Sequence, residues 1–441
     1  MNRRKFVGAV AALGSIKEAA RAQQAKRNGR ASNGSLLYLE QQWGAQHYDD
    51  KEREQVLDVI ARQNPFRWYG PRDAPPGRVF AFEKEFAARM QTKYALAVSS
   101  GTAALEAAVV ALGIGPGDEV IMPAWTWHSS ATAVIRAGAL PVFAEIDESF
   151  NIDPSDIEHR ITPQTRAIIA VHLQGNPADM DKVLAIARKH NLKILEDCAQ
   201  AVGGSYKGKP LGSLGDIGIY SHQLNKTITA GEGGSVVTND PALFERAARF
   251  HDVGSLRAQH EAVVGTPRFG AFVGTNQRMS EFAGGVMLAQ VRKLDLIVEA
   301  TRRHAQRVYE GIRGLPKARF RLLPDPAGEI GVAVFLGFDS KERCARYMAA
   351  LKQESVPCSR PGGSVVVPVQ SYIENKVATH PAWPTWNTPR GKAIQYGAAS
   401  CPRTLDILSR FAGVPINPKY TRRETDQIVA AIRKVYPEVM A

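Results

Sequence analysis

Short apolar runs alternate with amphipathic segments of helical length from about residue 40 onward. The apolar runs predict seven strands, at Tyr94–Ser99, Glu119–Met122, Pro141–Ile146, Ala167–His172, Lys193–Glu196, Ile217–Ser221 and Ser235–Thr238. Segments such as Thr102–Leu112 and Met180–His190 lie between them and have the length and pattern of helices. Strands that alternate with helices indicate an α/β fold, with a mostly parallel sheet covered by helices on both faces.

The pattern changes after the last of these strands. Ala283–Val308 is one long helical stretch that leads away from the sheet, and a strand (Val332–Leu336) and two helices (Lys341–Gln353, Thr421–Val435) follow it. These elements predict a smaller, C-terminal α+β domain. We therefore divide the chain into a leader and linker (1–34), a large α/β domain (35–295) and a small domain (296–441).

Composition and charge exclude several classes of protein. The chain has 441 residues, of which 44% are hydrophobic and 22% charged, which is typical of a globular protein. No run of about 18 apolar residues exists, so the sequence predicts no membrane-spanning helix. The net charge is +13, but residues 1–30 alone carry +7, and no basic cluster with interleaved aromatic residues follows them. We therefore expect neither nucleic acid nor a membrane as a partner.

The first residues are typical of an export signal. Arg3-Arg4-Lys5 precedes a mildly apolar run to Leu13, and Ala20-Arg21-Ala22 has the spacing of a cleavage site. This pattern predicts a Tat-like leader and a periplasmic or exported protein. A basic N-terminus of a cytoplasmic protein is the alternative, because Lys17-Glu18 interrupts the apolar run.

Cysteine and histidine spacing predicts neither disulfides nor a metal site. The four cysteines form no C-x-x-C pair and are interpreted as small buried residues; they are Cys198, Cys344, Cys358 and Cys401. His260-Glu261 begins like the zinc motif H-E-x-x-H, but Val264 occupies the position of the second histidine.

One candidate for an anion site lies at the start of a predicted helix. Ser99-Ser100-Gly101-Thr102 joins a strand to the helix, so the backbone N–H groups of Gly101 and Thr102 are free to bind an anion. A simple helix cap explains the same residues equally well.

Two further positions make a cofactor site more specific. Asp197 follows an apolar strand, at the end of the sheet where α/β proteins bind ligands. Lys226 follows another strand and precedes Gly231-Glu232-Gly233-Gly234; a lysine in such a poorly solvated pocket can lose its proton and form a Schiff base. An anion site, a carboxylate and a lysine are the three parts that pyridoxal 5′-phosphate (PLP) requires.

Six motifs in order extend this interpretation to nearly the whole chain from residue 50. The sequence SSGTAAL, PAWTWHSSATAV, VHLQGNPADMD, ILEDCAQA, SHQLNKTITAGEGGSVVTND and GTNQRMSEFAGGVMLAQVRKLD resembles the DegT/StrS-type aminotransferases, which act on keto-sugars and keto-cyclitols. The resemblance implies a PLP-dependent transferase of the aspartate-aminotransferase type (fold type I). It also implies an amino acid as donor, a keto-sugar or keto-cyclitol as acceptor, and a homodimer with shared active sites.

The resemblance assigns roles to individual positions. Lys226 would carry the cofactor and move protons, and Asp197 would pair with its ring nitrogen. The other cofactor-binding positions that it implies are Gly101, Thr102 and Ser221 at the phosphate, Trp127 and Gln200 at the ring, and Asn276 from the neighbouring subunit. His172 lies in a family motif, but a core histidine with satisfied hydrogen bonds explains it as well.

Two departures from the family pattern concern the substrate. His222-Gln223 stand where the commoner pattern has phenylalanine and histidine, as in glutamine-dependent inosose aminotransferases, so both residues are candidates for binding substrate. Residues 361–400 also differ from the usual substrate loop; Trp383 or Trp386 could cover a sugar ring there, or could be core residues.

Three other functions are weighed against an aminotransferase. A sugar dehydratase of the same family would have histidine in place of Lys226, and a PLP-binding sensor would not need the intact pair of Lys226 and Asp197. A nucleotide-binding protein is disfavoured because neither Leu211–Gly215 nor Gly231–Gly234 fits a P-loop or dinucleotide motif.

Overall fold

A seven-stranded sheet forms the larger part of the molecule. The computed structural model describes residues 47–67 and 77–441, so the predicted leader and linker lie outside the described residues. The strands lie in the order β1 (Tyr94–Val98), β10 (Gly234–Thr238), β9 (Ile217–Ser221), β6 (Lys193–Asp197), β5 (Thr165–Val171), β2 (Glu119–Pro123) and β4 (Leu140–Ala144). All seven predicted strands are therefore found, and only β10 runs antiparallel to its neighbours.

Helices cover both faces of this sheet, as predicted. One face carries α4 (Gly101–Ala111), α5 (His128–Arg136) and α8 (Pro241–His251). The other carries α3 (Arg78–Arg89), α6 (Pro154–Arg160), α7 (Met180–His190) and α10 (Glu281–Val291), and α2 (Asp50–Ala61) packs on α10. Alternate strand residues enter the two cores: Leu96 and Val98 face α4, whereas Ala95 and Ala97 face α3.

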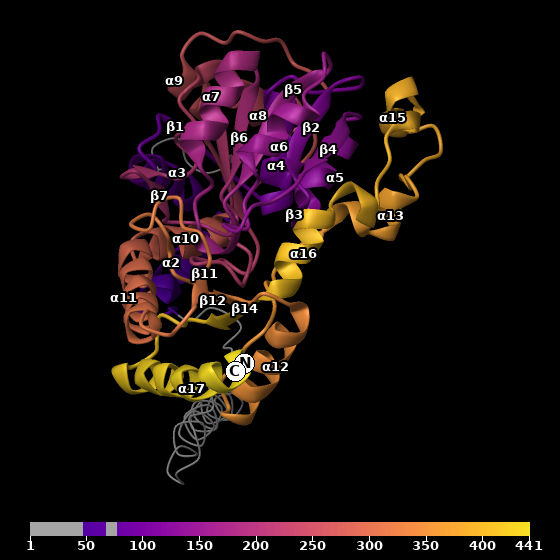
Figure 1. The fold of residues 1–441 in the computed structure, drawn as a ribbon. Helices are drawn as coiled ribbons and strands as arrows, with labels where there is room; N and C mark the ends of the chain where they lie inside the picture. Colours follow the sequence, from indigo (N-terminus) through magenta and orange to yellow (C-terminus); the bar gives the residue numbers. More distant parts are fainter. Residues whose placement is uncertain (1–46, 68–76) are drawn as a thin grey trace, which may run out of the picture.

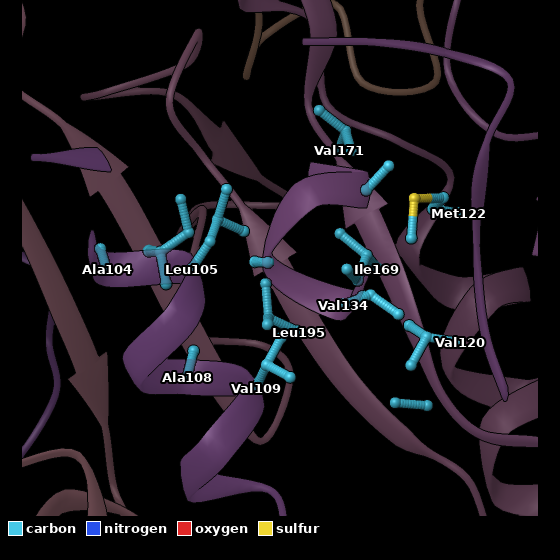
Figure 2. Close-up of a cluster of buried hydrophobic side chains, with 14 of the residues drawn as sticks. Ala104, Leu105, Ala108, Val109, Val120, Met122, Val134, Ile169, Val171 and Leu195 are labelled. Carbon is cyan, nitrogen blue, oxygen red and sulfur yellow. The ribbon is translucent and has the colours of Figure 1, made fainter. Parts of the chain in front are cut away.

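Figure 2 shows how α4 is attached to the sheet. Its buried side chains Ala104, Leu105, Ala108 and Val109 lie against apolar side chains of β2, β5 and β6. Because this face is fully apolar, the helix is fixed in position and its first turn is directed to the end of the sheet.

A second, three-stranded antiparallel sheet lies at the other end of the molecule. It contains β11 (Arg319–Phe320), β12 (Ala333–Gly337) and β14 (Phe411–Pro415), with α11 (Leu294–Ile312), α12 (Lys341–Gln353) and α17 (Arg422–Met440) around a separate apolar core. Figure 1 shows this part below the large sheet, with α11 and α17 at its outer side. The predicted long helix over Ala283–Val308 is in fact two helices, α10 and α11, which are separated at Arg292 and Lys293.

One segment of the C-terminal part packs on the large sheet. β13 (Val365–Val366) pairs with β3 (Trp125–Thr126), and α13 (Ser371–Glu374), α14 (Pro384–Asn387), α15 (Pro389–Ala393) and α16 (Pro402–Arg410) follow. Tyr396 donates a hydrogen bond to the carbonyl of Pro141 in β4 (2.9 Å), and Trp386 is buried in the apolar core to which α4 and α5 also contribute. The sequence placed this segment in the small domain, so its contacts with the large sheet are a difference from that prediction.

One further short pair of strands and a short helix complete the part of the chain that the structure describes. β7 (Ser205–Tyr206) pairs with β8 (Lys209–Pro210), and α9 (Ala258–Val264) packs on α8. Within residues 47–67 and 77–441, no helix is both long enough and apolar enough to cross a membrane.

Candidate active site

A cavity of about 840 Å³ opens at the carboxyl ends of the parallel strands. Its wall includes residues of the large sheet, such as Asp197 and Lys226, and residues next to the three-stranded sheet, such as Arg360 and Asn417. Eight of the residues singled out from the sequence line it: Gly101, Thr102, Trp127, Asp197, Gln200, Ser221, Gln223 and Lys226. The fold therefore brings together positions that lie up to 125 residues apart in the chain.

The first turn of α4 forms one end of this cavity. Ser100 caps the helix, because its Oγ accepts a hydrogen bond from the N–H of Ala103 (3.1 Å). The first intrahelical hydrogen bond runs from the N–H of Ala104 to the carbonyl of Ser100 (3.0 Å). The preceding N–H groups of Gly101 and Thr102 therefore have no acceptor within the helix and can donate to a bound anion. The Thr102 hydroxyl lies 2.7 Å from that of Ser129, which adds a second hydroxyl at the same end.

Asp197 ends β6 and is almost completely buried. One carboxylate oxygen accepts from the N–H of Ala199 (3.1 Å), and the other accepts from the hydroxyl of Ser130 (2.9 Å). Burial raises the pKa of Asp197, while these two hydrogen bonds and the charge of Lys226 act in the opposite direction. A buried carboxylate of this kind is suited to hold a proton on a heterocyclic nitrogen.

Lys226 lies in a turn that follows β9 and folds back on itself. Its N–H donates to the carbonyl of Gln223 (2.9 Å), and the N–H of Leu224 donates to the carbonyl of Gly231 (3.0 Å). Burial lowers the pKa of Lys226, and the charge of Asp197 opposes this only partly. The amine is consequently a better nucleophile and proton acceptor than a lysine in water.

Trp127 and Gln200 line the same cavity as Asp197. Trp127 precedes α5 and is 52% exposed, which leaves the large indole free to stack on a flat ligand. Gln200 donates its amide to the carbonyl of Gly363 (3.1 Å) and to the hydroxyl of Ser364 (2.8 Å). Trp125, two positions before Trp127, is a core residue that packs edge-on against Phe150.

His222 does not contact the cavity, in contrast to the expectation from the sequence. Its side chain is 0% exposed, and its Nε2 lies 2.8 Å from the hydroxyl of Ser235. The imidazole packs edge-on against Phe82 and Phe86, and burial lowers its pKa to about 3. Of the two substrate candidates, only Gln223 lies at the cavity.

Asn276 is exposed and lies outside the cavity of its own chain. Its backbone forms an antiparallel bridge with Asp252, whose carboxylate is ion-paired with Arg257 and Arg278. This placement is compatible with a role at the site of a second copy of the chain.

The tryptophans of residues 361–400 do not face the cavity either. Trp383 donates its indole N–H to the carbonyl of Ile135 at the end of α5 (2.6 Å), and Trp386 is a core residue. Only Gly362 and Gly363 of this stretch line the cavity. The stretch therefore serves mainly to attach the C-terminal part to the large sheet.

Arg360 is a cavity residue that sequence reasoning missed. It and Lys226 are the two Lys or Arg side chains that line the cavity among the described residues. Arg360 is exposed and follows Ser359, whose backbone exchanges two hydrogen bonds with Gly413 of β14 (3.0 and 2.7 Å). Its signal in the sequence is only an arginine before Pro361-Gly362-Gly363, which by itself indicates a turn.

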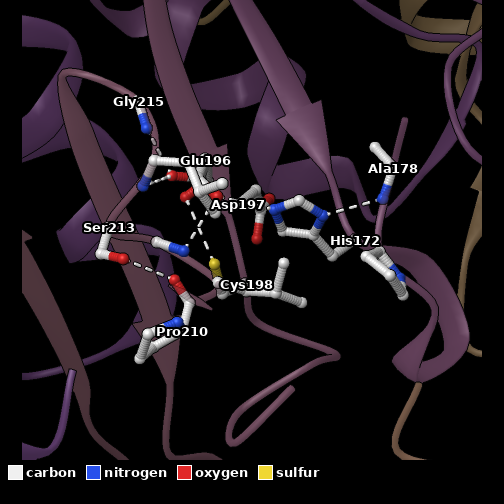
Figure 3. A network of polar contacts seen from close by, with 12 residues as sticks. His172, Ala178, Glu196, Asp197, Cys198, Pro210, Ser213 and Gly215 are labelled. Carbon is white, nitrogen blue, oxygen red and sulfur yellow. Dashed lines mark hydrogen bonds and ion pairs between the residues drawn. The ribbon is translucent and has the colours of Figure 1, made fainter. Parts of the chain in front are cut away.

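Next to Asp197 lies a buried polar network that contains His172, Glu196 and Cys198 (Figure 3). These three side chains are close enough to hold a metal ion, but their atoms already have partners. Glu196 accepts from His172 Nε2 (3.1 Å) and from the N–H groups of Gly212, Leu214 and Gly215 (2.9, 2.7 and 2.7 Å). His172 Nδ1 accepts from the N–H of Ala178 (3.1 Å), which supports the interpretation of His172 as a core histidine with satisfied hydrogen bonds.

The residues that line the cavity fit PLP in their chemistry. A Cβ at Gly101 would lie 2.7 Å from the Cβ of Ser221, so the glycine keeps open the cradle between α4 and β9. Free N–H groups suit the phosphate, Trp127 suits the ring face, and Asp197 and Lys226 suit the ring nitrogen and the aldehyde.

The fold and this cavity define the class of PLP-dependent transferases of the aminotransferase type. The model of the DegT/DnrJ/EryC1/StrS aminotransferase family matches residues 48–433, and the chain belongs to this family. The family, the fold class and PLP as cofactor, all predicted from the sequence, are thereby confirmed.

Several curated proteins are similar to the chain. GDP-perosamine synthase of Escherichia coli O157:H7 is 42% identical over 236 residues, which are 53% of this chain and 63% of the relative. L-glutamine:2-deoxy-scyllo-inosose aminotransferase of Micromonospora echinospora is 35% identical over 289 residues (65% and 69%). Spore coat polysaccharide biosynthesis protein SpsC of Bacillus subtilis (strain 168) is 32% identical over 362 residues (81% and 89%). The chain thus spans less than two thirds of the E. coli relative.

Solved structures share the fold over nearly the whole chain. The structure of 3-amino-5-hydroxybenzoic acid (AHBA) synthase has a TM-score of 0.74 at 27% identity, with 92% of this chain and 100% of that chain covered. An aminotransferase from Psychrobacter cryohalolentis has a TM-score of 0.75 at 29% identity, with 91% and 99% covered.

Proposed function

We propose that the protein is an aminotransferase that moves an amino group from an amino acid, glutamate or glutamine, to a keto-sugar or keto-cyclitol. The single observation that carries this proposal is that Lys226 and Asp197 line the same cavity as the first turn of α4. When bound there, PLP supplies an electron sink for removal of the donor's Cα proton. The names of the relatives, a GDP-perosamine synthase and a scyllo-inosose aminotransferase, support a polyhydroxylated cyclic ketone as acceptor.

Lys226, Asp197 and Trp127 have different roles in the proposed reaction. Lys226 Nζ is the attachment point for the cofactor, and its lowered pKa lets the same amine accept and return a proton during transfer. Asp197 Oδ holds the proton on the ring nitrogen, and Trp127 fixes the tilt of the ring. Lysine at position 226, rather than histidine, supports amino transfer over dehydration.

The acceptor end of the cavity is polar. Gln223, Asn225 and Asn417 line the cavity, and we assign their amides to pair with the hydroxyl groups of a polyol acceptor. Pairing is needed because a hydroxyl that is buried without a partner costs about 1–3 kcal/mol. The exposed Arg360 supplies a positive charge for the carboxylate of the amino donor.

A dimer with shared sites is part of this proposal. Asn276 is exposed and lies outside its own cavity, as a residue would that completes the phosphate site of a second copy.

Chemical labelling tests the attachment point. Borohydride reduction of the holoprotein followed by peptide mapping should place the pyridoxyl label on Lys226, and Lys226→Ala should lose it. Lys189→Ala, at an exposed lysine paired with Glu158, serves as the control that keeps the label. A label on any other lysine of the wild-type protein contradicts the assignment.

The two half-reactions test the substrates separately. Glutamate or glutamine alone should convert the bound cofactor to its amine form, which is followed by absorbance, and a cyclic polyhydroxy ketone should restore the starting spectrum. If no amino donor changes the spectrum, the protein is a PLP-binding sensor instead. If only linear 2-oxo acids restore the spectrum, it is an amino-acid transaminase and the sugar or cyclitol assignment fails.

A further inference from the structure

A chain of three buried oxygen groups leads from β3 to Asp197. The hydroxyl of Thr126 lies 2.9 Å from that of Ser130, and Ser130 Oγ lies 2.9 Å from Asp197 Oδ2. The exposed fractions of Thr126, Ser130 and Asp197 are 0%, 0% and 3%, so water does not compete for these hydrogen bonds. The three groups therefore form a continuous chain inside the protein.

The chemistry of the three groups determines which one donates in each of these two hydrogen bonds. An ionised carboxylate only accepts hydrogen bonds, so Ser130 donates its single hydroxyl proton to Asp197. The Ser130 oxygen can then accept, and Thr126 donates to it. Because each donor polarises the next one, the Thr126 hydroxyl strengthens the hydrogen bond that reaches Asp197.

The position of both hydroxyls is determined by elements that do not belong to β6. Thr126 lies on β3, where its backbone pairs with Val365 of β13. Ser130 lies in the first turn of α5, where its N–H donates to the carbonyl of Trp127 (3.2 Å). The serine is thus attached to the same turn as the tryptophan that faces the cavity, while its side chain points to the carboxylate.

The hydrogen bonds from Thr126 to Ser130 and from Ser130 to Asp197 affect the charge state of the carboxylate as well as the packing. Burial favours the protonated form of Asp197, and a protonated Asp197 could not stabilise a positive charge on a ring nitrogen. We propose that Ser130, supported by Thr126, is a positioning residue that keeps the Asp197 carboxylate ionised and directed at the ring nitrogen of PLP. This inference rests on the assignment of Asp197 in the proposed function, but it concerns cofactor binding and can be tested without turnover.

The test compares PLP with an analogue that has a CH group in place of the ring nitrogen. Apoprotein is titrated with each compound, and the dissociation constants are measured for the wild type, Ser130→Ala, Ser130→Thr and Thr126→Val. Ser130→Ala should weaken PLP binding about tenfold or more, as expected for loss of a hydrogen bond to a charged group. Ser130→Thr should restore most of the affinity, and Thr126→Val should show a smaller loss than Ser130→Ala.

The analogue distinguishes positioning from a general structural effect. Because the analogue makes no contact with Asp197 through a ring nitrogen, Ser130→Ala should leave its affinity nearly unchanged. An equal loss for PLP and for the analogue would overturn the proposal, as would an unchanged affinity for PLP.

A matched control and a pH profile complete the experiment. Ser149 is also buried and donates its hydroxyl to a carboxylate, that of Asp147, but it does not line the cavity; Ser149→Ala should lose stability but not PLP affinity. In Ser130→Ala the acid limb of the donor half-reaction should move to higher pH by about one unit, since Asp197 then binds a proton more readily. If the donor half-reaction does not occur in any variant, the proposed function fails while the two binding titrations still decide the role of Ser130.

Discussion

Gly101 at the start of α4 lies directly against Ser221 at the end of β9. A Cβ at position 101 would lie 2.7 Å from the Cβ of Ser221 and 3.0 Å from its Oγ, so any other residue must push the helix away from the strand. Since the first turn of α4 is the proposed phosphate site, we expect Gly101→Ala to weaken PLP binding at least tenfold, measured by titration of apoprotein.

The matched control for this variant is Gly115→Ala. A Cβ at Gly115 meets no atom within 4 Å, and its backbone does not require glycine. Gly115→Ala should leave the affinity for PLP unchanged. Unchanged affinity in Gly101→Ala would show that the helix end is not the phosphate site.

Arg360→Gln should impair use of the amino donor. The guanidinium is the charge that we assign to the donor carboxylate, so the KM for glutamate or glutamine should rise about tenfold to a hundredfold, with a smaller effect on kcat. A donor analogue without the α-carboxylate should react equally with both proteins. Arg343→Gln, at a half-buried arginine of α12 that pairs with Asp339, is the control. Equal KM values for wild type and Arg360→Gln would contradict the assignment.

Mixing two inactive variants tests whether Asn276 acts across subunits. Neither Lys226→Ala nor Asn276→Ala has a complete site, but a mixed dimer regains one site with both residues. After free subunit exchange, about a quarter of the wild-type activity should return, because half of the dimers are mixed and each has one complete site. Sedimentation of a fully active monomer, or no recovery after proven exchange, would refute the shared site.

His222 should make the protein less stable in acid. Its folded-state pKa of about 3 lies below the ordinary value of 6.5, so between these values the unfolded chain binds more protons than the folded one. The stabilising effect of the neutral imidazole is complete above about pH 6.5 and is lost as the pH falls toward 3, by up to about 1.4 kcal/mol per pH unit.

The measurement is the free energy of unfolding by urea at several pH values between 7.5 and 4.5. His222→Gln should be less stable than the wild type at pH 7.5 but should show a shallower decline in acid. The same change at the exposed His159 should leave the slope as it is. A parallel decline in wild type and His222→Gln would show that this histidine does not contribute.

Strand positions were predictable from the sequence because buried strands need uninterrupted apolar runs. All seven predicted strands lie in one sheet, and the helix Met180–His190 has the predicted ends because Asp179 caps its start and Asn191 takes the left-handed conformation at its end. The break between α10 and α11 was not predictable from periodicity. It lies at Lys293, which is ion-paired with Glu52 of α2, and that contact exists only in the folded chain.

The orientation of side chains around the cavity was predictable only in part. Ser221 is the last residue of β9 and His222 follows it directly, so alternation along the strand already implies that their side chains face opposite sides. The resemblance to the family nevertheless suggested that both side chains face the substrate. Arg360 was not predictable, because its place depends on the pairing of Ser359 with Gly413, more than 50 residues later in the chain. Residues that enter the site through long-range pairing carry no local signal.

The segment around Arg360 is fastened at both ends. Ser359 is hydrogen-bonded to β14 of the three-stranded sheet, and six residues later Val365 pairs with Thr126 of the large unit. If both pairings persist, any rotation of one sheet against the other must change backbone torsion angles within residues 360–364. Gly362 and Gly363 allow a wide range of such angles. The side-chain amide of Gln200 restricts them, because it donates hydrogen bonds to the carbonyl of Gly363 and the hydroxyl of Ser364. The segment is a short connection of fixed length between the two sheets. We therefore expect it to limit how far the mouth of the cavity can widen, and thereby the size of the molecules that can enter.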